Sequence, residues 1–170
     1  CEAVNLFEQR AVAAAPKFKI TDHNAEAVVR VCQRLDGIPL AIELAAVRLR
    51  ALPVEELLDR LDDRFSLLTT GNRAALERHQ TLRATIDWSY NLLTPAEQCL
   101  FRRLAMFVNG CTLEAAEVLC NADGDLPIDV LDGLAALVDK SLLQQIEGTN
   151  GEARFTMLET IREFGLEQLA

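Results

Sequence analysis

The chain has 170 residues, half of them hydrophobic (50%), so it is long enough to bury the core of one large domain or two small ones. Its 17 basic residues against 26 acidic ones give a net charge of -9, which repels nucleic-acid phosphates unless the basic groups gather on one face, and the sequence shows no such gathering. The five cysteines are odd in number and lack Cys-x-x-Cys spacing, and no apolar run reaches the roughly 18 residues that a bilayer span needs, so we expect a cytoplasmic protein with no membrane segment.

Apolar residues recur at three- and four-residue spacing through the first 65 residues and predict four helices. The first ends at Pro16, because proline lacks the amide that a continuing helix needs. The second follows the polar residues 21–24, which offer several caps, and ends at Gly37. Pro39 and Pro53 suit the first helical position of the third and fourth helices. Together these helices are expected to form one bundle.

Between residues 69 and 81 the helical periodicity fails, and the sequence TTGNR introduces turn formers and polar side chains. This composition is typical of a link between two compact units. We therefore place a domain boundary here, with a helical domain at residues 1–72 and a second domain at residues 73–170.

The second domain opens with a helix that carries Trp88 and ends before the sequence TPAE at residues 94–97. That sequence is a capping box with proline at the first helical position. Further helices are expected that are led by Thr94, by Thr112 with Glu114, and by Pro127, separated by Asn- and Gly-containing turns.

After residue 140 the pattern changes to two short segments, residues 141–146 and 153–157, separated by the turn sequence GTNG. They predict a β-hairpin, followed by a closing helix over about residues 158–169. Several helices followed by a hairpin is the order of a winged helix, in which the helix before the hairpin is the recognition helix. The predicted fold class is mainly α, a helical bundle followed by a winged-helix domain with a small β-hairpin.

Three stretches in this order resemble the NB-ARC family of signal-transducing P-loop ATPases, the STAND class, in the form found in large bacterial transcriptional regulators. They are residues 37–46 (GIPLAIELAA), 78–90 (RHQTLRATIDWSY) and 155–164 (FTMLETIREF). The resemblance implies a helical lid domain and a winged-helix domain that lie downstream of a P-loop domain. The chain contains no Gly-x-x-x-x-Gly-Lys-Ser/Thr motif, so we expect no phosphate cradle and no hydrolysis here.

The resemblance implies a nucleotide lid at Gly37, Ile38, Pro39 and Leu40, in which the proline packs against the adenine of a bound nucleotide. Proline fits this role because its ring is a flat apolar surface. The other interpretation is that Pro39 only starts a helix, since its fixed φ begins the helix without loss of a hydrogen bond.

The family's Met-His-Asp motif, whose histidine touches the terminal phosphate of ADP, aligns with Met157, Leu158 and Glu159. Leucine has no polar atom for a phosphate, so the resemblance carries no phosphate contact to Leu158. The alternative for these positions is structural: Leu158 in the core and Glu159 as a first-turn acid that the helix dipole favours.

The resemblance thus implies a regulatory, non-catalytic part of an ATP/ADP-switched signal-transduction protein or transcription regulator. It would close over ADP or ATP bound by the upstream P-loop domain of the same chain, and by itself it would bind no nucleotide. A face left uncovered by that missing domain would favour self-association.

The predicted recognition helix argues against DNA contact. Four carboxylates lie on or near it against one lysine, and the hairpin adds two more: Asp125, Asp129, Asp132, Asp139, Lys140, Glu147 and Glu152. A helix that reads a groove needs Arg, Lys, Asn or Gln toward bases and phosphates. We therefore expect protein contacts, and keep a DNA-binding winged helix and a helical protein-interaction scaffold as alternatives, with a small-molecule enzyme last.

The remaining polar residues give weaker signals. His23 and His79 are the only histidines and neither has a cysteine at zinc-binding spacing, so no metal site is expected. Residues 73–83 form the most basic stretch, which would either contact a nucleotide phosphate or the missing domain, or form a solvated linker.

Overall fold

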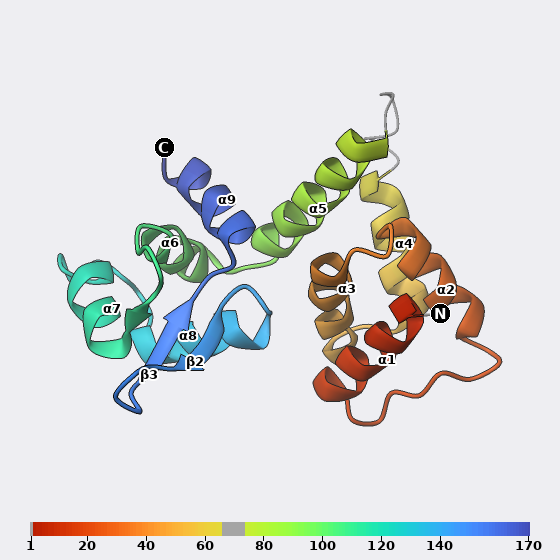
Figure 1. Cartoon of the computed structure of the whole chain (residues 1–170), viewed down its shortest axis with the longest axis horizontal. Coiled ribbons are helices and arrows are strands. Elements are labelled where there is room, and N and C mark those ends of the chain that lie inside the picture. Colours follow the sequence, from red (N-terminus) through yellow and green to blue (C-terminus); the bar gives the residue numbers. More distant parts are fainter. Residues whose placement is uncertain (1, 66–73) are drawn as a thin grey trace. The chain divides into compact units, whose positions relative to one another are not determined.

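The computed structural model describes residues 2–65 and 74–170, and the side chains of residues 2–62 and 80–170. The chain divides into two compact units, residues 1–88 and residues 89–170 (Figure 1). The boundary predicted between residues 72 and 73 lies outside the described residues and stays a prediction.

The N-terminal unit is helical. Its elements are α1 (Glu2–Ala14), α2 (Ala25–Arg34), α3 (Pro39–Ala46), the 3-10 helix η1 (Val47–Arg50), α4 (Val54–Phe65) and the first part of α5 (Ala74–Asn91). The apolar stripes of these helices meet in one core that includes Phe7, Val31, Leu35, Ile42 and Leu57, all fully buried. The core also includes Trp88, 4% exposed, from α5. Amphipathic spacing therefore gives the predicted bundle.

The turn between α2 and α3 shows why α2 ends where it does. Asp36 takes a positive φ of 52°, and Gly37 one of 65°. The amide of Gly37 donates to Cys32 O and that of Asp36 to Gln33 O, each at 3.0 Å, as in a Schellman motif. Ile38 is then extended, and Pro39 occupies the first turn of α3. The predicted stop and restart are confirmed.

The C-terminal unit has the element order of a winged helix. It contains α6 (Pro95–Leu104), β1 (Cys111–Thr112), α7 (Leu113–Cys120), α8 (Val130–Asp139), β2 (Gln144–Glu147), β3 (Ala153–Thr156) and α9 (Glu159–Leu169). The strands form an antiparallel sheet in the order β1-β3-β2, with Gln145 and Cys111 both opposite Phe155. The mainly helical fold with a winged helix is confirmed.

Side-chain caps fix the starts of α6, α7 and α8. Thr94 Oγ1 accepts from the amide of Glu97 at 3.3 Å, and Glu97 Oε2 accepts from the amide of Thr94 at 2.9 Å, which confirms the predicted capping box. Thr112 Oγ1 accepts from the amide of Ala115 at 3.2 Å. The third prediction is corrected: α8 begins at Val130, because Asp129 caps it by accepting from the amide of Asp132 at 3.1 Å.

Three further boundaries differ from the sequence prediction. Helix α5 begins at Ala74, so residues 74–81 are helical although their periodicity is weak. The first hairpin strand begins at Gln144 and not at Ser141, which has a φ of 58° and ends α8. Strand β1 was not predicted, because two residues carry no detectable alternation.

The core of the C-terminal unit combines leucines with an aromatic cluster. The rings of Tyr90, Phe101 and Phe164 lie 5.4 to 6.5 Å apart, centroid to centroid, and bring α5, α6 and α9 together. Leu134 and Leu137 of α8 are fully buried, and α8 packs against α6. Within the described residues, no helix combines the length and apolarity that a membrane span needs.

Candidate functional site

Helix α8 holds the position of a recognition helix, the last helix before the hairpin. Val130, Gly133, Leu134 and Leu137 form its buried face. Gly133 lets α8 approach α6 closely, because a Cβ at this position would collide with Leu100. The opposite side of the helix is therefore the one available to a partner.

The exposed face of α8 is apolar and acidic. Leu131 is 49% exposed, and Asp132, Ala135 and Asp139 are also exposed, with Val138 half-buried. The helix carries no arginine, lysine, asparagine or glutamine. Since those are the side chains that most often read purine edges and bind phosphates, this face lacks the contacts on which most groove-reading helices depend.

Two of the carboxylates that the sequence placed on or near this helix have structural partners. Asp129 caps α8, and Asp125 precedes the helix and binds Arg103. The exposed carboxylates of the α8 face are Asp132 and Asp139.

The wing, formed by β2, β3 and the turn between them, adds a second acidic surface. All four residues of β2 are exposed, and β2 is an edge strand of the sheet. A shallow hollow of about 290 Å³ beside it is lined by Gln145, Ile146, Glu147, Gly151 and Ala153. Its charged lining residue is Glu147, and Glu152 lies exposed at the turn, so an anion would be repelled here as well.

Charge is unevenly divided between the two units. Residues 89–170 carry 13 acidic and five basic side chains, a net charge of -8, whereas residues 1–88 carry 13 and 12, a net charge of -1. Nearly the whole net negative charge of the chain therefore belongs to the winged-helix unit, because that unit has few basic residues. An approaching DNA backbone would be repelled by the unit whose fold is associated with DNA binding.

Each of the five basic side chains in residues 89–170 already has a partner within that unit. Lys140 Nζ lies 2.6 Å from Glu97 Oε1, and Arg102 donates to the Tyr90 hydroxyl at 2.7 Å. Arg154 donates to Gly110 O at 3.2 Å. The remaining two are Arg103, bound to Asp125, and Arg162, bound to Glu159. A phosphate would have to compete with these contacts.

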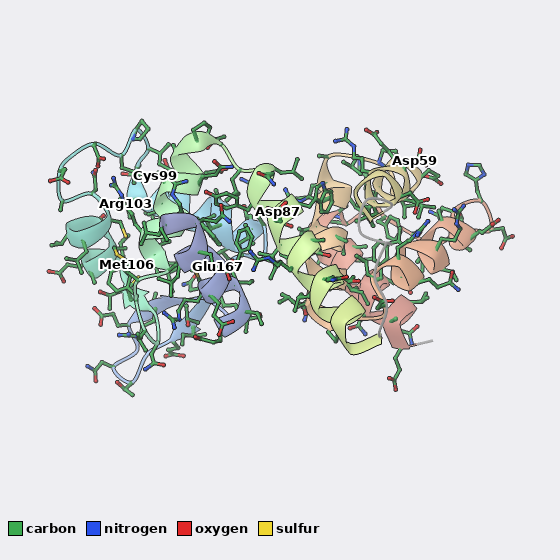
Figure 2. All side chains as sticks on the ribbon, turned by 90° about the horizontal axis from the view of Figure 1, so that it is seen from above. Asp59, Asp87, Cys99, Arg103, Met106 and Glu167 are labelled. Atoms are coloured by element: carbon green, nitrogen blue, oxygen red, sulfur yellow. The ribbon has the colours of Figure 1, made fainter. Side chains whose placement is uncertain are left out.

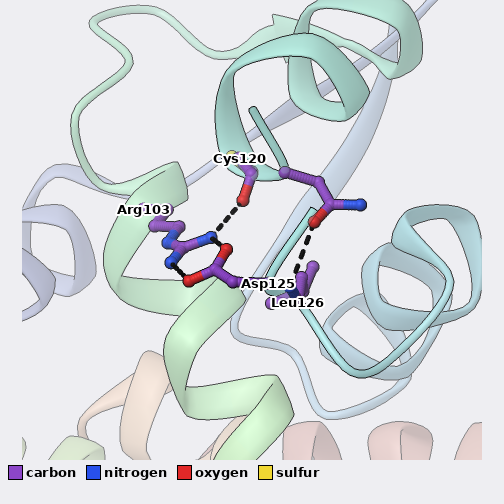
Figure 3. Close-up of polar contacts among 5 residues, drawn as sticks. Arg103, Cys120, Asp125 and Leu126 are labelled. Carbon is purple, nitrogen blue, oxygen red and sulfur yellow. Dashed lines mark hydrogen bonds and ion pairs between the residues drawn. The ribbon is translucent and has the colours of Figure 1, made fainter. Parts of the chain in front are cut away.

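The Arg103 contacts hold the connection between α7 and α8 (Figure 3). Its guanidinium makes two hydrogen bonds to the Asp125 carboxylate, at 2.8 and 2.6 Å, and one to Cys120 O at 2.6 Å. Asn121 Oδ1 accepts from the amide of Leu126 at 3.0 Å in the same loop. The hydrogen bond to Arg103 lowers the pKa of Asp125 and raises that of Arg103. Arg103, labelled on α6 with Cys99 in Figure 2, thus serves the fold.

The predicted lid residues lie at the turn between α2 and α3. Gly37 and Pro39 are exposed, and Ile38 and Leu40 are half-buried. Asp36 accepts a hydrogen bond from Thr81 Oγ1 of α5 at 2.8 Å, which holds this turn in place. The exposed ring of Pro39 provides an apolar surface of the kind that a purine base requires, and the four residues offer no side-chain donor to phosphates.

The predicted motif at Met157, Leu158 and Glu159 lies in the C-terminal unit, at the start of α9. Leu158 is the N-cap residue and is 38% exposed, so the alternative that placed it in the core does not hold. Glu159 is exposed and makes two hydrogen bonds with Arg162, at 3.0 and 2.7 Å, which lower its pKa. Arg162 also donates to Ala105 O at 3.3 Å. The carboxylate therefore has a structural partner on its own helix.

Buried thiols and one histidine are further reactive groups in the part of the chain that the structure describes. Burial raises the pKa of Cys32 and of Cys120 to about 11, so both thiols are protonated near neutral pH. Among the described residues, no three His, Cys, Asp or Glu side chains are grouped to hold a metal ion. His23 is exposed, and the side chains of His79 and of the basic residues Arg73 and Arg78 lie outside the described residues.

Comparison with known proteins agrees with the winged-helix fold. Residues 93–170 match the winged helix-turn-helix domain family. A protein of Mycobacterium bovis that is provisionally named an HTH-type transcriptional regulator is 53% identical over 169 residues, which is 99% of this chain and 19% of that protein. A Mycobacterium tuberculosis protein with the same provisional name shows the same identity and coverage.

An uncharacterized protein of Mycobacterium tuberculosis is 39% identical over 170 residues, which is 99% of this chain and 43% of that protein. The chain thus spans about a fifth of the first relatives and less than half of the other.

Proposed function

Starting from the winged helix-turn-helix domain of residues 93–170, we propose that the chain is a non-catalytic regulatory part of a transcription regulator, in which the winged helix contacts protein and not DNA. The family match and the names of the relatives support the regulatory role. The observation that carries the choice of protein over DNA is the charge of the winged-helix unit. That unit has a net charge of -8, and all five of its basic side chains are engaged in internal contacts.

Direct DNA binding by this unit is the second candidate function. The fold match and the relatives' provisional name favour it, and they support it more directly than they support any role with nucleotides. Against it stands the exposed face of α8, which presents Leu131, Asp132, Ala135 and Asp139 to a partner. To bind DNA there, the unit would have to gain phosphate contacts from the side chains that now hold Glu97, Asp125 and Glu159.

A selection experiment separates the two candidates. A random library of DNA duplexes is passed repeatedly over the 170-residue chain, and the retained duplexes are sequenced. We expect no sequence to be enriched, because α8 carries no basic side chain that could contact base edges. Enrichment of one sequence would favour the DNA-binding candidate and would contradict the proposed function.

A finer proposal concerns nucleotide. We propose that the turn at Gly37–Leu40 closes over ADP or ATP that an upstream P-loop domain of the full-length protein holds, as the NB-ARC resemblance implies. The exposed ring of Pro39 supports contact with the base, and the lack of phosphate donors supports a lid role without hydrolysis. The bound nucleotide would favour the closed arrangement, because a ligand shifts a population only when it binds one conformation more tightly than the other.

Calorimetric titration of ADP into this chain and into the longer protein tests the lid proposal. We expect no heat of binding with the chain alone, binding with the longer protein, and weaker binding after Pro39→Ala. Tight binding by the chain alone, or no binding by the longer protein, would overturn the lid and leave the regulatory role of the winged helix in place.

A further inference from the structure

The exposed face of α8 has the pattern of a helix-packing surface. Leu131, Ala135 and Val138 follow one another at i, i+4 and i+7, which places them along one line of the helix. Leu131 is the most prominent, because nearly half of its side chain (49%) is exposed although its neighbour Val130 is buried. A small residue between two larger ones gives a shallow profile into which a ridge of another helix can fit.

Carboxylates lie beside this apolar line. Asp132 and Asp139 are exposed and stand seven residues apart, so they follow the same edge of the stripe. Lys140, the nearest basic residue in sequence, is held by Glu97 at 2.6 Å. The surface is therefore an apolar strip bordered by negative charge, and a partner that buries it must supply apolar side chains with positive charge next to them.

The charge of the unit excludes two other occupants. A second copy of the same unit would bring a net charge of -8 toward a net charge of -8, and its five basic side chains are engaged within it. DNA would bring phosphates and no apolar face. A helix with an apolar stripe and basic flanks satisfies both features of the surface.

We propose that the exposed face of α8 is a docking surface for an amphipathic helix of a partner protein or domain, with Leu131 as its apolar anchor and Asp132 as a charge that selects arginine or lysine on the partner. This inference rests on the proposed function, because it names the chemistry of the protein contact proposed there. The anchor gives affinity through burial of its side chain, and the carboxylate gives orientation and salt dependence.

The test uses a synthetic peptide of about 15 residues, long enough to become helical on binding, with leucines at i, i+4 and i+7 and lysines on both flanks. A scrambled peptide of the same composition lacks the stripe, and a third peptide has glutamate in place of lysine. Fluorescence anisotropy measures the affinity of each for the 170-residue chain. We expect the striped basic peptide to bind and the other two to bind at least about tenfold more weakly.

Variants of the chain locate the site. Leu131→Ser should weaken the striped peptide about tenfold, and Asp132→Lys should weaken it and reduce its salt dependence. The matched controls are Leu119→Ser, at an apolar residue of α7 that is 57% exposed, and Asp123→Lys, at an exposed carboxylate of the loop. Both should bind the peptide as the unchanged chain does, and circular dichroism checks that every variant is folded.

Equal binding of the striped and scrambled peptides, or a loss of binding with Leu119→Ser but not with Leu131→Ser, would overturn the docking surface. So would an absence of peptide binding. None of these results affects the proposed function, which is tested separately by the binding of DNA duplexes.

Discussion

At the scale of single residues, Glu97 links the start of α6 to the end of α8. One carboxylate oxygen accepts from the amide of Thr94 at 2.9 Å, and the other lies 2.6 Å from Lys140 Nζ. Burial raises the pKa of Glu97, but the hydrogen bonds from Lys140 and Thr94 outweigh it, so the pKa lies below its ordinary value. A phosphate would have to compete with this contact for Lys140, the lysine nearest to α8.

We expect Glu97→Gln to lower the free energy of unfolding at pH 7 by about 1 to 2 kcal/mol, because the amide keeps the cap but loses the charge that Lys140 needs. The pKa of Glu97 is lowered in the folded state, so the carboxylate stabilises the fold above its unfolded pKa and loses this effect as pH falls through the folded value. The difference between variant and parent should thus shrink below about pH 4.

Urea unfolding at several pH values measures this difference. Lys140→Met is the control. In chains that carry Lys140→Met, adding Glu97→Gln should change the free energy of unfolding much less than it does in the parent chain. The ion-pair account would be contradicted if the difference in unfolding free energy between Glu97→Gln and the parent stayed constant from about pH 3 to about pH 7, the range in which carboxyl groups titrate.

Thr81 holds the turn that presents Pro39. Its hydroxyl donates to Asp36 Oδ2 at 2.8 Å, and its own carbonyl accepts from Thr85 Oγ1 at 2.8 Å. Thr81 is 8% exposed, whereas Asp36 is exposed, so the contact is partly buried. The contact with Asp36 could not be predicted from the sequence, because hydrophobic periodicity carries no information about a hydrogen bond between residues 45 positions apart.

We expect Thr81→Val, which keeps the shape and removes the hydroxyl, to lower the free energy of unfolding by about 1 kcal/mol. Amide hydrogen exchange should rise at Asp36 and Gly37, which take left-handed conformations in the turn that Thr81 contacts. Thr81→Ser keeps the donor and serves as the control. Exchange at the turn that is unchanged in Thr81→Val would contradict the role of Thr81.

At the scale of elements, Gly110 allows β1 to pair with β3. It has a φ of 79°, and a Cβ there would collide with the backbone oxygen of Phe155. Gly124 in the α7–α8 loop has a φ of 64° but open space around a Cβ. Substitution at Gly124 therefore tests backbone strain alone, and substitution at Gly110 tests strain together with steric collision.

We expect Gly124→Ala to cost about 1 kcal/mol through the left-handed conformation alone, and Gly110→Ala to cost about 3 kcal/mol because the strand pairing must also shift. Thermal and urea unfolding of the two variants give the comparison. Equal losses would show that the close approach of Gly110 to Phe155 does not matter for stability.

The predictability of the elements follows the strength of local signals. The capping box at Thr94 and the stop at Gly37 were predicted because side chain–backbone hydrogen bonds and positive φ values depend on neighbouring residues. Strand β1 was missed because its two residues are strand only through pairing with Phe155 and Arg154, more than 40 positions away. The start of α8 was misplaced because Pro127 gives a stronger local signal than Asp129, which supplies the cap.

At the scale of the whole molecule, the decisive feature is how charge is divided. The net charge of -9 is nearly all in residues 89–170, which have -8, and the helical unit before them is close to neutral. The sequence suggested a carboxylate-rich recognition helix, but it could not show that Asp129 caps that helix, that Asp125 binds Arg103, or that each basic residue of the unit is engaged. Those facts depend on contacts between residues far apart in sequence.

The most direct measurement of the central claim is the affinity of the 170-residue chain for a labelled DNA duplex as a function of salt concentration, from about 50 mM upward, where phosphate contacts are strongest. We expect no saturable binding even at the lowest salt, because the winged-helix unit repels the phosphates and its basic side chains are engaged. Submicromolar binding that falls steeply with added salt would show that this unit makes several phosphate contacts, and would contradict the account.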